Sequence, residues 1–417
     1  MKKVIIGVLG IGRGRTMIDY CRKSQNAEVV AICDKWEEGL NSLKIQLNNS
    51  NISFYTSFDE FINHEMDAVV LANYATEHAP FAIKCLKGGK HVFSEVLPCQ
   101  TMQQAVELIE TVEETGLIYA YGENYCFMNG PYEMRKLYKE GKIGEFEYGE
   151  GEYIHNTKKW RYELTYGERD HWRNNGYSTF YCTHALGPII HITGLRPIKV
   201  TGFEGYVCKR GQETGSKTAS PGIIMVTLEN GGIFKAIQGG LYKNSIWYSI
   251  YGSLGRVETA REDAQCGDCN RVYVNLDEYP DQYFDESTGL KTYEINNEGS
   301  EYGHGGSDYW TMFNFCNKIL GDDNADIIDV YEALDMFLPG MFGYRSILAG
   351  GKSMDVPDLR IKYYRDIYRN DTACTDPKVA GKQLLPCQAI GNPDIPDEVF
   401  EREKAKWDKW KEDNLNK

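Results

Sequence analysis

Two side chains suited to proton transfer, Tyr181 and His184, stand three residues apart in the segment "FYCTHALGP". Residues at this spacing lie on one side of a helix, so we expect both to reach the same face of a bound molecule. The alternative is a structural pair that stabilises a domain interface. We predict that Tyr181 and His184 are the catalytic residues.

A glycine-rich turn, "GVLGIGRGR", follows the first apolar segment and precedes a helical pattern. Glycines here allow the backbone to approach a diphosphate whose charge lies at a helix N-terminus. The second apolar segment ends in Asp34, which suits the ribose hydroxyls of NAD better than the 2′-phosphate of NADP; a helix cap is its alternative role. NAD is the predicted cofactor, and the residues predicted to bind it here are Gly10, Gly12, Arg13, Gly14, Arg15 and Asp34.

The elements that position these residues follow two different patterns. Short apolar strands alternate with helical segments over residues 1–125, which is typical of βαβ units on a parallel sheet. From about residue 144, period-two alternation with glycine-rich turns indicates an open, largely antiparallel sheet. We predict an α/β chain with a Rossmann domain over 1–125, an α+β substrate-binding and oligomerisation domain over 126–375, and an extension over 376–417. A helix at about 130–140 is expected to pack back on the first domain, and the charged tail to form a solvated helix.

Further polar side chains stand where strands end. Asn73 and His78 end and follow the fourth strand, where open α/β sheets bind ligands, and we expect them near the nicotinamide ribose. "HVFSEVLPC" places Glu95 at the end of the fifth strand, either toward the nicotinamide and a sugar hydroxyl or as a helix cap. His304, between glycines in "EYGHGGSDYW", either faces the pocket or forms a helix-entry loop. The histidines expected at the surface or in packing are His64, His155 and His191.

Composition and charge exclude several classes of function. The net charge of −14 over 417 residues argues against a nucleic-acid partner and against attraction to an anionic membrane. No apolar stretch approaches the roughly 20 residues that span a bilayer. The 12 cysteines are scattered through apolar segments, as buried thiols in a reducing compartment are, so we expect a cytoplasmic protein. Cys266 and Cys269 form one C-x-x-C pair without further ligands, which favours a polar hairpin tip over a metal site, and no metal is expected.

The order of the glycine loop, "NYATEH", "GGKHVFSE" and "GEN" resembles the Gfo/Idh/MocA superfamily of NAD(P)-dependent sugar and inositol oxidoreductases, over essentially the whole chain. In that family the fifth strand usually ends Glu-Lys-Pro, and dehydrogenases carry an Asp four residues before a catalytic histidine. Here these positions hold Val96 and Phe180. The resemblance therefore implies either an inactive chain or chemistry other than simple dehydrogenation.

The departures themselves resemble glycoside hydrolase family 109. The matching motifs are Glu95-Val96 with a following proline, Glu123-Asn124, "YCTHALGP", and "GHGGSD" ending at Asp308. This resemblance implies cleavage of a glycosidic bond by oxidation at sugar C3, proton loss at C2, elimination, water addition and re-reduction. It assigns His184 to the C3 hydroxyl and Tyr181 to the C2 proton, and these roles are exchangeable.

Two positions depart from that branch. Phe127 stands where a tyrosine is common, with Tyr125 nearby, and the branch's Trp-Arg pair matches either Trp160-Arg161 or Trp172-Arg173, of which we favour the second. The resemblance implies further cofactor residues, namely Asn73, His78, Glu95, Asn124, Trp172 and Arg173. It implies substrate-binding residues, namely Glu95, Tyr125, Arg173, Tyr181 and His304.

Three functions follow from the sequence. The leading hypothesis is an NAD-dependent, redox-neutral glycosidase with a small carbohydrate substrate; the sugar, its anomeric form and the leaving group stay open. The second is a sugar or polyol dehydrogenase that has replaced its lysine, and the third is a non-catalytic NAD-binding sensor. The many aromatic residues suit either sugar stacking or an apolar sheet face, and such a face predicts a homodimer or homotetramer.

Overall fold

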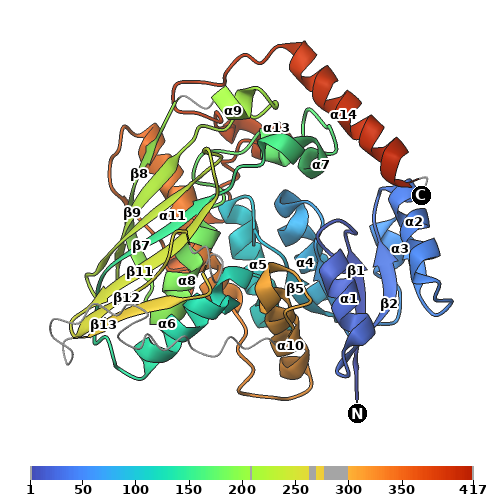
Figure 1. The fold of residues 1–417 in the computed structure, drawn as a ribbon, viewed down its shortest axis with the longest axis horizontal. Coiled ribbons are helices and arrows are strands. Elements are labelled where there is room, and N and C mark those ends of the chain that lie inside the picture. Colours follow the sequence, from blue (N-terminus) through green and yellow to red (C-terminus); the bar gives the residue numbers. More distant parts are fainter. Residues whose placement is uncertain (1, 207–208, 263–268, 277–298, 416–417) are drawn as a thin grey trace.

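The computed structural model describes residues 2–206, 209–262, 269–276 and 299–415, arranged around two sheets (Figure 1). The first sheet is parallel, with the strand order β3-β2-β1-β4-β5-β6. Its strands are nearly continuous apolar runs because helices cover both faces. Its elements are β1 (Val4–Leu9), α1 (Arg15–Lys23), β2 (Ala27–Cys33), α2 (Glu37–Leu47), β3 (Ser53–Tyr55), α3 (Phe58–Phe61), β4 (Ala68–Leu71), α4 (His78–Lys87), β5 (His91–Ser94), α5 (Met102–Thr115) and β6 (Tyr119–Tyr121).

The second sheet has the strand order β13-β12-β11-β7-β10-β9-β8-β14, and all its pairs except β7 with β10 are antiparallel. The predicted Rossmann domain and open-faced, largely antiparallel sheet are thereby confirmed. The elements are α6 (Asn129–Lys139), β7 (Phe146–Ile154), α7 (Arg161–Thr165), α8 (Thr183–Thr193), β8 (Pro197–Glu204), α9 (Lys209–Gln212), β9 (Gly222–Leu228), β10 (Ile233–Gly239), β11 (Ser245–Gly252), β12 (Gly255–Thr259), β13 (Val272–Leu276), α10 (Ser307–Ile319), α11 (Val330–Leu348) and β14 (Met354–Asp355).

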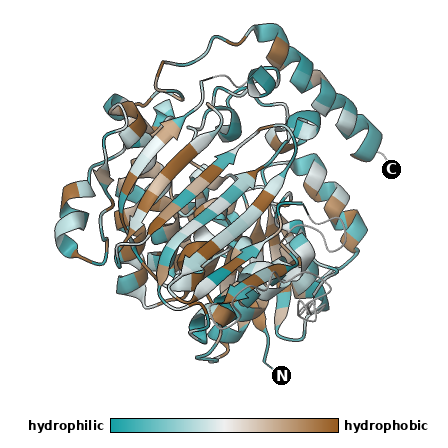
Figure 2. Ribbon diagram, turned by 60° about the vertical axis from the view of Figure 1, so that its left-hand side comes forward, coloured by the Kyte–Doolittle hydropathy of each residue, from teal (hydrophilic) through white to brown (hydrophobic). Residues whose placement is uncertain are grey.

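One face of the second sheet is covered and the other is open. Helices α8 and α11 pack on the covered face, whereas no described helix covers the other (Figure 2). The side chains alternate accordingly: Phe234 and Ala236 point into the core, and Ile233 and Lys235 point outward. Phe203, Ile233 and Tyr251 are the most exposed large apolar residues of this outer face, at 53%, 45% and 41%.

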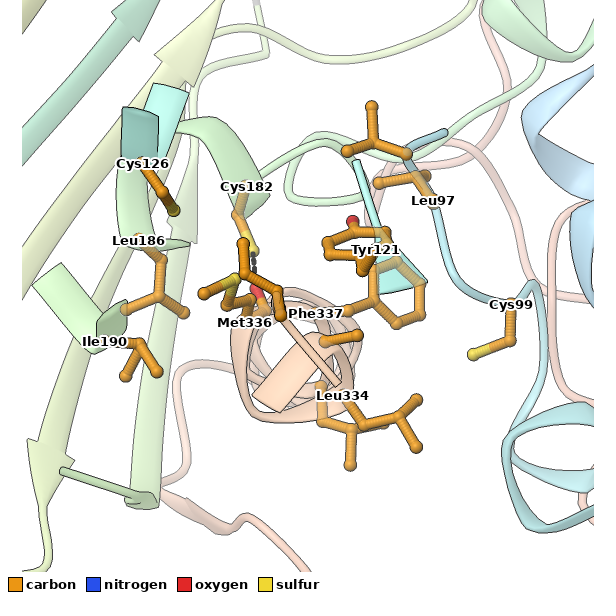
Figure 3. Close-up of a cluster of buried hydrophobic side chains, with 14 of the residues drawn as sticks. Leu97, Cys99, Tyr121, Cys126, Cys182, Leu186, Ile190, Leu334, Met336 and Phe337 are labelled. Carbon is orange, nitrogen blue, oxygen red and sulfur yellow. Dashed lines mark hydrogen bonds between the residues drawn. The ribbon is translucent and has the colours of Figure 1, made fainter. Parts of the chain in front are cut away.

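A hydrophobic core runs across both domains. Residues after β5 and in β6 meet residues of α8 and α11, including Leu97, Tyr121, Leu186 and Phe337 (Figure 3). The Cys182 thiol donates to the Met336 carbonyl oxygen there. All the cysteines that the structure describes are buried. Cys266 lies outside the described residues, and Cys269 is buried rather than at an exposed hairpin tip.

The prediction that the helix at 130–140 packs back on the first domain is wrong. This helix, α6, packs against α8 and the strands β12 and β13. It is tied there by the Gly130 N–H, which donates to the Cys269 carbonyl oxygen at 2.6 Å. Helix α10, by contrast, packs against the first domain, where Met312, Phe315 and Cys316 join the core around β1 and α1.

The tail forms α13 (Pro377–Ala380), α14 (Asp397–Leu415) and their connections, and α14 ends beside α2 of the first domain (Figure 1). The predicted helix is present, but one side of it is buried. Trp407 is 5% exposed and packs against Trp36 and Tyr166. A Cβ on Gly12 would lie 2.8 Å from the Tyr166 hydroxyl, so this aromatic group borders the glycine loop.

No helix among the described residues is long and apolar enough to cross a membrane.

Candidate functional site

The glycine loop between β1 and α1 is a turn that other residues would block. Gly10 has a φ of 97°, and a Cβ there would lie 2.5 Å from the backbone of Ala72. A Cβ on Gly14, the N-cap residue of α1, would lie 2.1 Å from the Gly10 carbonyl oxygen. The first N–H groups of α1 are therefore accessible to a phosphate at close range.

The Asp34 carboxylate braces this loop. Its Oδ2 accepts from the Ile11 N–H at 2.8 Å and its Oδ1 from the Trp36 N–H at 2.9 Å. The N-cap residue of α2 is Trp36, so Asp34 does not have the alternative capping role. Arg15, by contrast, turns away from the loop and donates to Gln46 on α2.

The end of β4 carries Asn73 and His78. Asn73 donates to Glu77 at 3.1 Å, and its Oδ1 is buried without a hydrogen-bond partner, as a cofactor-facing amide would be. His78 is 1% exposed, and its Nδ1 lies 3.0 Å from the Leu97 carbonyl oxygen. Burial lowers the pKa of His78 to about 4, so its neutral ring holds the segment that follows β5.

Four of the sequence motifs meet around one buried carboxylate. Arg13 of the glycine loop donates to Asp308 through both Nη atoms, at 2.7 and 2.6 Å, and lies 3.0 Å from Glu95. Asn124 donates to Asp308 Oδ1 at 2.7 Å, and His304 Nδ1 lies 3.0 Å from Asp308 Oδ2. The glycine loop, the end of β5, the "GEN" segment and the start of α10 are thus linked.

The charges of this cluster are strongly coupled. Burial would raise the pKa of Asp308, but hydrogen bonds from Arg13 and His304 hold it well below its usual range. Burial raises the pKa of Glu95, an effect that the charge of Arg13 opposes. Glu95 does not cap a helix, because the N-cap of α5 is Thr101.

Beside this cluster, His184 is held by a buried carboxylate. Glu123 is fully buried, and its Oε1 lies 2.7 Å from His184 Nδ1 while its Oε2 accepts from Thr183 Oγ1 at 2.8 Å. A carboxylate only accepts hydrogen bonds, so Nδ1 carries the proton and Nε2 has a free lone pair. His184 is thereby prepared to take a proton at Nε2.

Tyr181 and His184 share one side as predicted, but not one helix. Helix α8 begins at Thr183, so Tyr181 lies in the preceding turn, with its ring centroid 4.9 Å from that of His184. Burial raises the pKa of Tyr181, and the charge of Arg173 opposes this rise. The Tyr125 ring lies 4.3 Å from His184 on another side.

A cavity of about 160 Å³ is lined by Tyr181, whose ring lies between it and that of His184. Arg173 lies over the Trp172 ring, 4.4 Å from its centroid, and 5.4 Å from that of Tyr181, so the favoured Trp172-Arg173 pair faces the cavity. Arg161 also lines it, whereas Trp160 packs on His155. Residues that line the cavity include Tyr153, His155, Trp172, Arg173, Tyr181 and Gln238.

The expectation that His155 is only a surface or packing residue is wrong, because it lines this cavity. His191 is buried between Glu332 and Asp326, and the His64 ring contacts the Tyr55 hydroxyl, so both have packing roles. The sequence prediction also omitted Glu123 and Asp308 as site residues. Glu123 and Asp308 both stand in motifs quoted from the sequence, and those motifs could have identified them. No motif contains His155.

The two positions that depart from the dehydrogenase pattern are apolar contacts. Val96 is 7% exposed and belongs to the hydrophobic core. Phe180 packs edge-on against Tyr177 and Phe337, in the same core. The two positions that hold a lysine and an aspartate in the dehydrogenase pattern therefore carry no charge in this chain.

Fold and site together define a two-domain dinucleotide-binding protein in which His184 and Tyr181 of the second domain lie together beside the Glu123 carboxylate. Residues 1–123 match the family GFO_IDH_MocA, described as "Oxidoreductase family, NAD-binding Rossmann fold". The N-terminal domain is therefore an NAD-binding domain similar to those of this oxidoreductase family, as the sequence resemblance implied.

Among curated relatives, "Glycosyl hydrolase family 109 protein 1" of Shewanella sp. (strain MR-4) is 29% identical over 201 residues, and "Alpha-N-acetylgalactosaminidase" of Shewanella oneidensis is 27% identical over the same length. Each match covers 45% of this chain and 44% of the relative, so the chain spans less than half of the length of these relatives.

Solved structures share the fold. Myo-inositol 2-dehydrogenase from Lactobacillus plantarum superposes with a TM-score of 0.67 at 18% identity, covering 85% of this chain and 100% of that one. Scyllo-inositol dehydrogenase from Lactobacillus casei, solved with NAD(H) and scyllo-inositol, gives 0.66 at 19% identity, with coverages of 85% and 99%.

Proposed function

We propose that the protein is an NAD-dependent, redox-neutral glycosidase. The observation that carries this proposal is the combination of an organised proton-transfer pair with uncharged Val96 and Phe180. His184, Glu123 and Tyr181 are in place, whereas the lysine and aspartate typical of the dehydrogenases are replaced by core residues. Distant likeness to glycoside hydrolase family 109 proteins supports the same reaction class.

The residues present fit NAD. The cradle formed by Gly10 and Gly14, the Asp34 carboxylate and the unpartnered Asn73 Oδ1 would hold it. When bound, NAD supplies reversible two-electron oxidation of a sugar hydroxyl. Oxidation at C3 acidifies the C2 proton, so that the C1 leaving group is lost by elimination without a second carboxylate catalyst of the ordinary kind.

Side chains of the protein carry out the proton transfers. His184 Nε2 accepts a proton from the sugar, and Glu123 stabilises the imidazolium that results. Because burial raises the pKa of Tyr181, its phenol stays protonated at neutral pH and serves better as a donor than as a base. We therefore depart from both assignments made from the sequence: His184 is the base that takes protons from the sugar, and Tyr181 is a hydrogen-bond donor in place of a base at C2.

The second candidate is a sugar or polyol dehydrogenase, because removal of a hydroxyl proton by His184 is common to both reactions. The test incubates purified protein with paired α- and β-aryl glycosides, with no NAD added, in D₂O. Release of the aglycone with deuterium at C2 of the sugar supports the glycosidase. NADH accumulation on added NAD without bond cleavage refutes the glycosidase and favours the dehydrogenase.

A further inference from the structure

The cavity beside Tyr181 is lined by cations and by no carboxylate among the residues that the structure describes. The cations are Lys158, Arg161, Arg173 and Arg210. This is unusual in a chain whose net charge is −14. Another groove shows the contrast, since acidic and basic side chains alternate there and pair with one another; it is lined by Glu110, Glu113, Glu114, Arg360, Lys362 and Arg365.

The positive charge of the cavity is only partly neutralised. Lys158 forms an ion pair with Glu213 at the exposed rim. Arg210 donates to Asn156 Oδ1 at 3.0 Å, and its buried Nε has no hydrogen-bond partner. Within the described part of the chain, neither Arg173 nor Arg210 has a carboxylate oxygen within 4.0 Å. Among the described residues these two guanidinium groups therefore form no direct ion pair.

Arg173 is also oriented for binding. Its guanidinium lies over the Trp172 ring and interacts with the Tyr181 hydroxyl, which leaves further N–H groups in its plane for a ligand. A guanidinium in this arrangement matches the two oxygens of a carboxylate, a sulfate ester or a phosphate ester. Since Arg173 is next to Tyr181, an anion bound there belongs to the same sugar ring that contacts the proton-transfer pair.

Neighbouring imidazoles respond to the same positive potential. Burial lowers the pKa of His155 to about 4, and the charge of Arg173 acts in the same direction. Burial lowers the pKa of His171 to about 2, and the charges of Arg173 and Arg161 act in the same direction. A potential that disfavours protonated imidazole favours an anionic group in the cavity.

We propose that the substrate is an anionic glycoside, in which the sugar ring that is cleaved carries a carboxylate, sulfate or phosphate ester bound by Arg173 and Arg210. This inference rests on the glycosidase function proposed above. It names the substrate class of that site and explains why a strongly acidic protein has a cationic cavity.

The test compares aryl glycosides in pairs that differ only at C6. One pair is a glucuronide and the matching glucoside, the other is a galacturonide and the matching galactoside, and each is tested as the α and the β anomer. Aryl glycosides with a 6-sulfate or a 6-phosphate show which of the three anionic groups, carboxylate, sulfate ester or phosphate ester, the cavity prefers. We expect kcat/KM for at least one anionic substrate to exceed that of its neutral partner by tenfold or more. The advantage should fall several-fold when NaCl is raised from about 0.05 to 0.5 M, since salt screens the attraction.

Arg210→Gln should reduce the anionic-to-neutral ratio by about tenfold, whereas Arg22→Gln, at an exposed position on α1, should leave it unchanged. Equal cleavage of anionic and neutral partners would overturn this inference and leave the glycosidase function standing. If no glycoside is cleaved, the function fails instead, and calorimetry with methyl glucuronide and methyl glucoside decides the cavity's preference. Equal binding of those two sugars would refute the anionic site.

Discussion

The Glu123–His184 pair offers a sharp test of the proposed chemistry, through the substitution Glu123→Gln. The amide keeps the shape of the carboxylate and one acceptor oxygen for His184 Nδ1–H, but it removes the negative charge. The ring orientation is retained, whereas the imidazolium formed during proton transfer loses its counter-ion. Glu123 is therefore a positioning residue whose charge matters most when His184 is protonated.

The expected size of the effect follows from the contact. A buried hydrogen bond to a charged group contributes about 1.5–3 kcal/mol, compared with about 1 kcal/mol for a neutral one. Because the amide keeps the neutral bond, the loss is the difference of about 0.5–2 kcal/mol, and kcat should fall about 2- to 30-fold. KM should change little, because Glu123 is fully buried and does not contact the cavity.

The assay measures aglycone release and deuterium incorporation at C2, with the melting temperature recorded in parallel. Thr183→Val is the matched control, because it removes the hydrogen bond to the other oxygen of Glu123 and leaves the contact with His184. We expect Thr183→Val to lower stability by about 1–2 kcal/mol with a much smaller loss of kcat. Activity of Glu123→Gln within twofold of the wild type, or an equal loss in both variants, would refute the assignment.

Three further predictions concern the cofactor, pH and assembly. Asp34→Ala should weaken NAD binding at least tenfold by calorimetry. The substitution removes the carboxylate that accepts from the Ile11 and Trp36 N–H groups and that would accept from the ribose hydroxyls of NAD. Unchanged affinity would contradict the cofactor site. Burial lowers the pKa of His191, but Glu332 and Asp326 together raise it overall, so its stabilising charge is fully present below about pH 6.5 and is lost as pH rises through the raised value. Urea unfolding should therefore show His191→Gln to be more destabilising at pH 6 than at pH 9, and a pH-independent difference would be evidence against this. We propose that a second copy covers the open sheet face, so light scattering should show a dimer or tetramer that Ile233→Glu with Tyr251→Glu dissociates; a wild-type monomer at all concentrations would exclude it.

Local patterns in the sequence were sufficient for much of this architecture. The glycines at positions 10 and 14 indicate the turn after β1 by their spacing, and the apolar runs of β1 and β2 predict buried parallel strands directly. The alternation in β10 likewise predicts one buried and one exposed face. The position of Tyr181 was predicted less well, since spacing alone does not tell where α8 begins.

The remaining features depend on contacts between distant segments. His155 lines the cavity only because the end of β7 lies near the segment that carries Arg210 and the turn that carries Arg173. The amphipathic pattern of α6 shows that one side of the helix is buried, but it does not identify the elements against which that side packs. The hydrogen bond from the Gly130 N–H to the Cys269 carbonyl oxygen fixes that position, and it joins segments far apart in the sequence. The cationic character of the cavity was hidden for the same reason, because its four cations are spread over three separate segments.

The position of α14 has a consequence for how the protein is made. The first domain carries the glycine loop and Asp34, and it can complete its parallel sheet while the rest of the chain is still being synthesised. Trp407, which packs on Trp36 and Tyr166 beside that loop, is synthesised long after both of them. The first domain therefore folds before α14 exists, and the border of the glycine loop gains its Trp407 contacts in a later step.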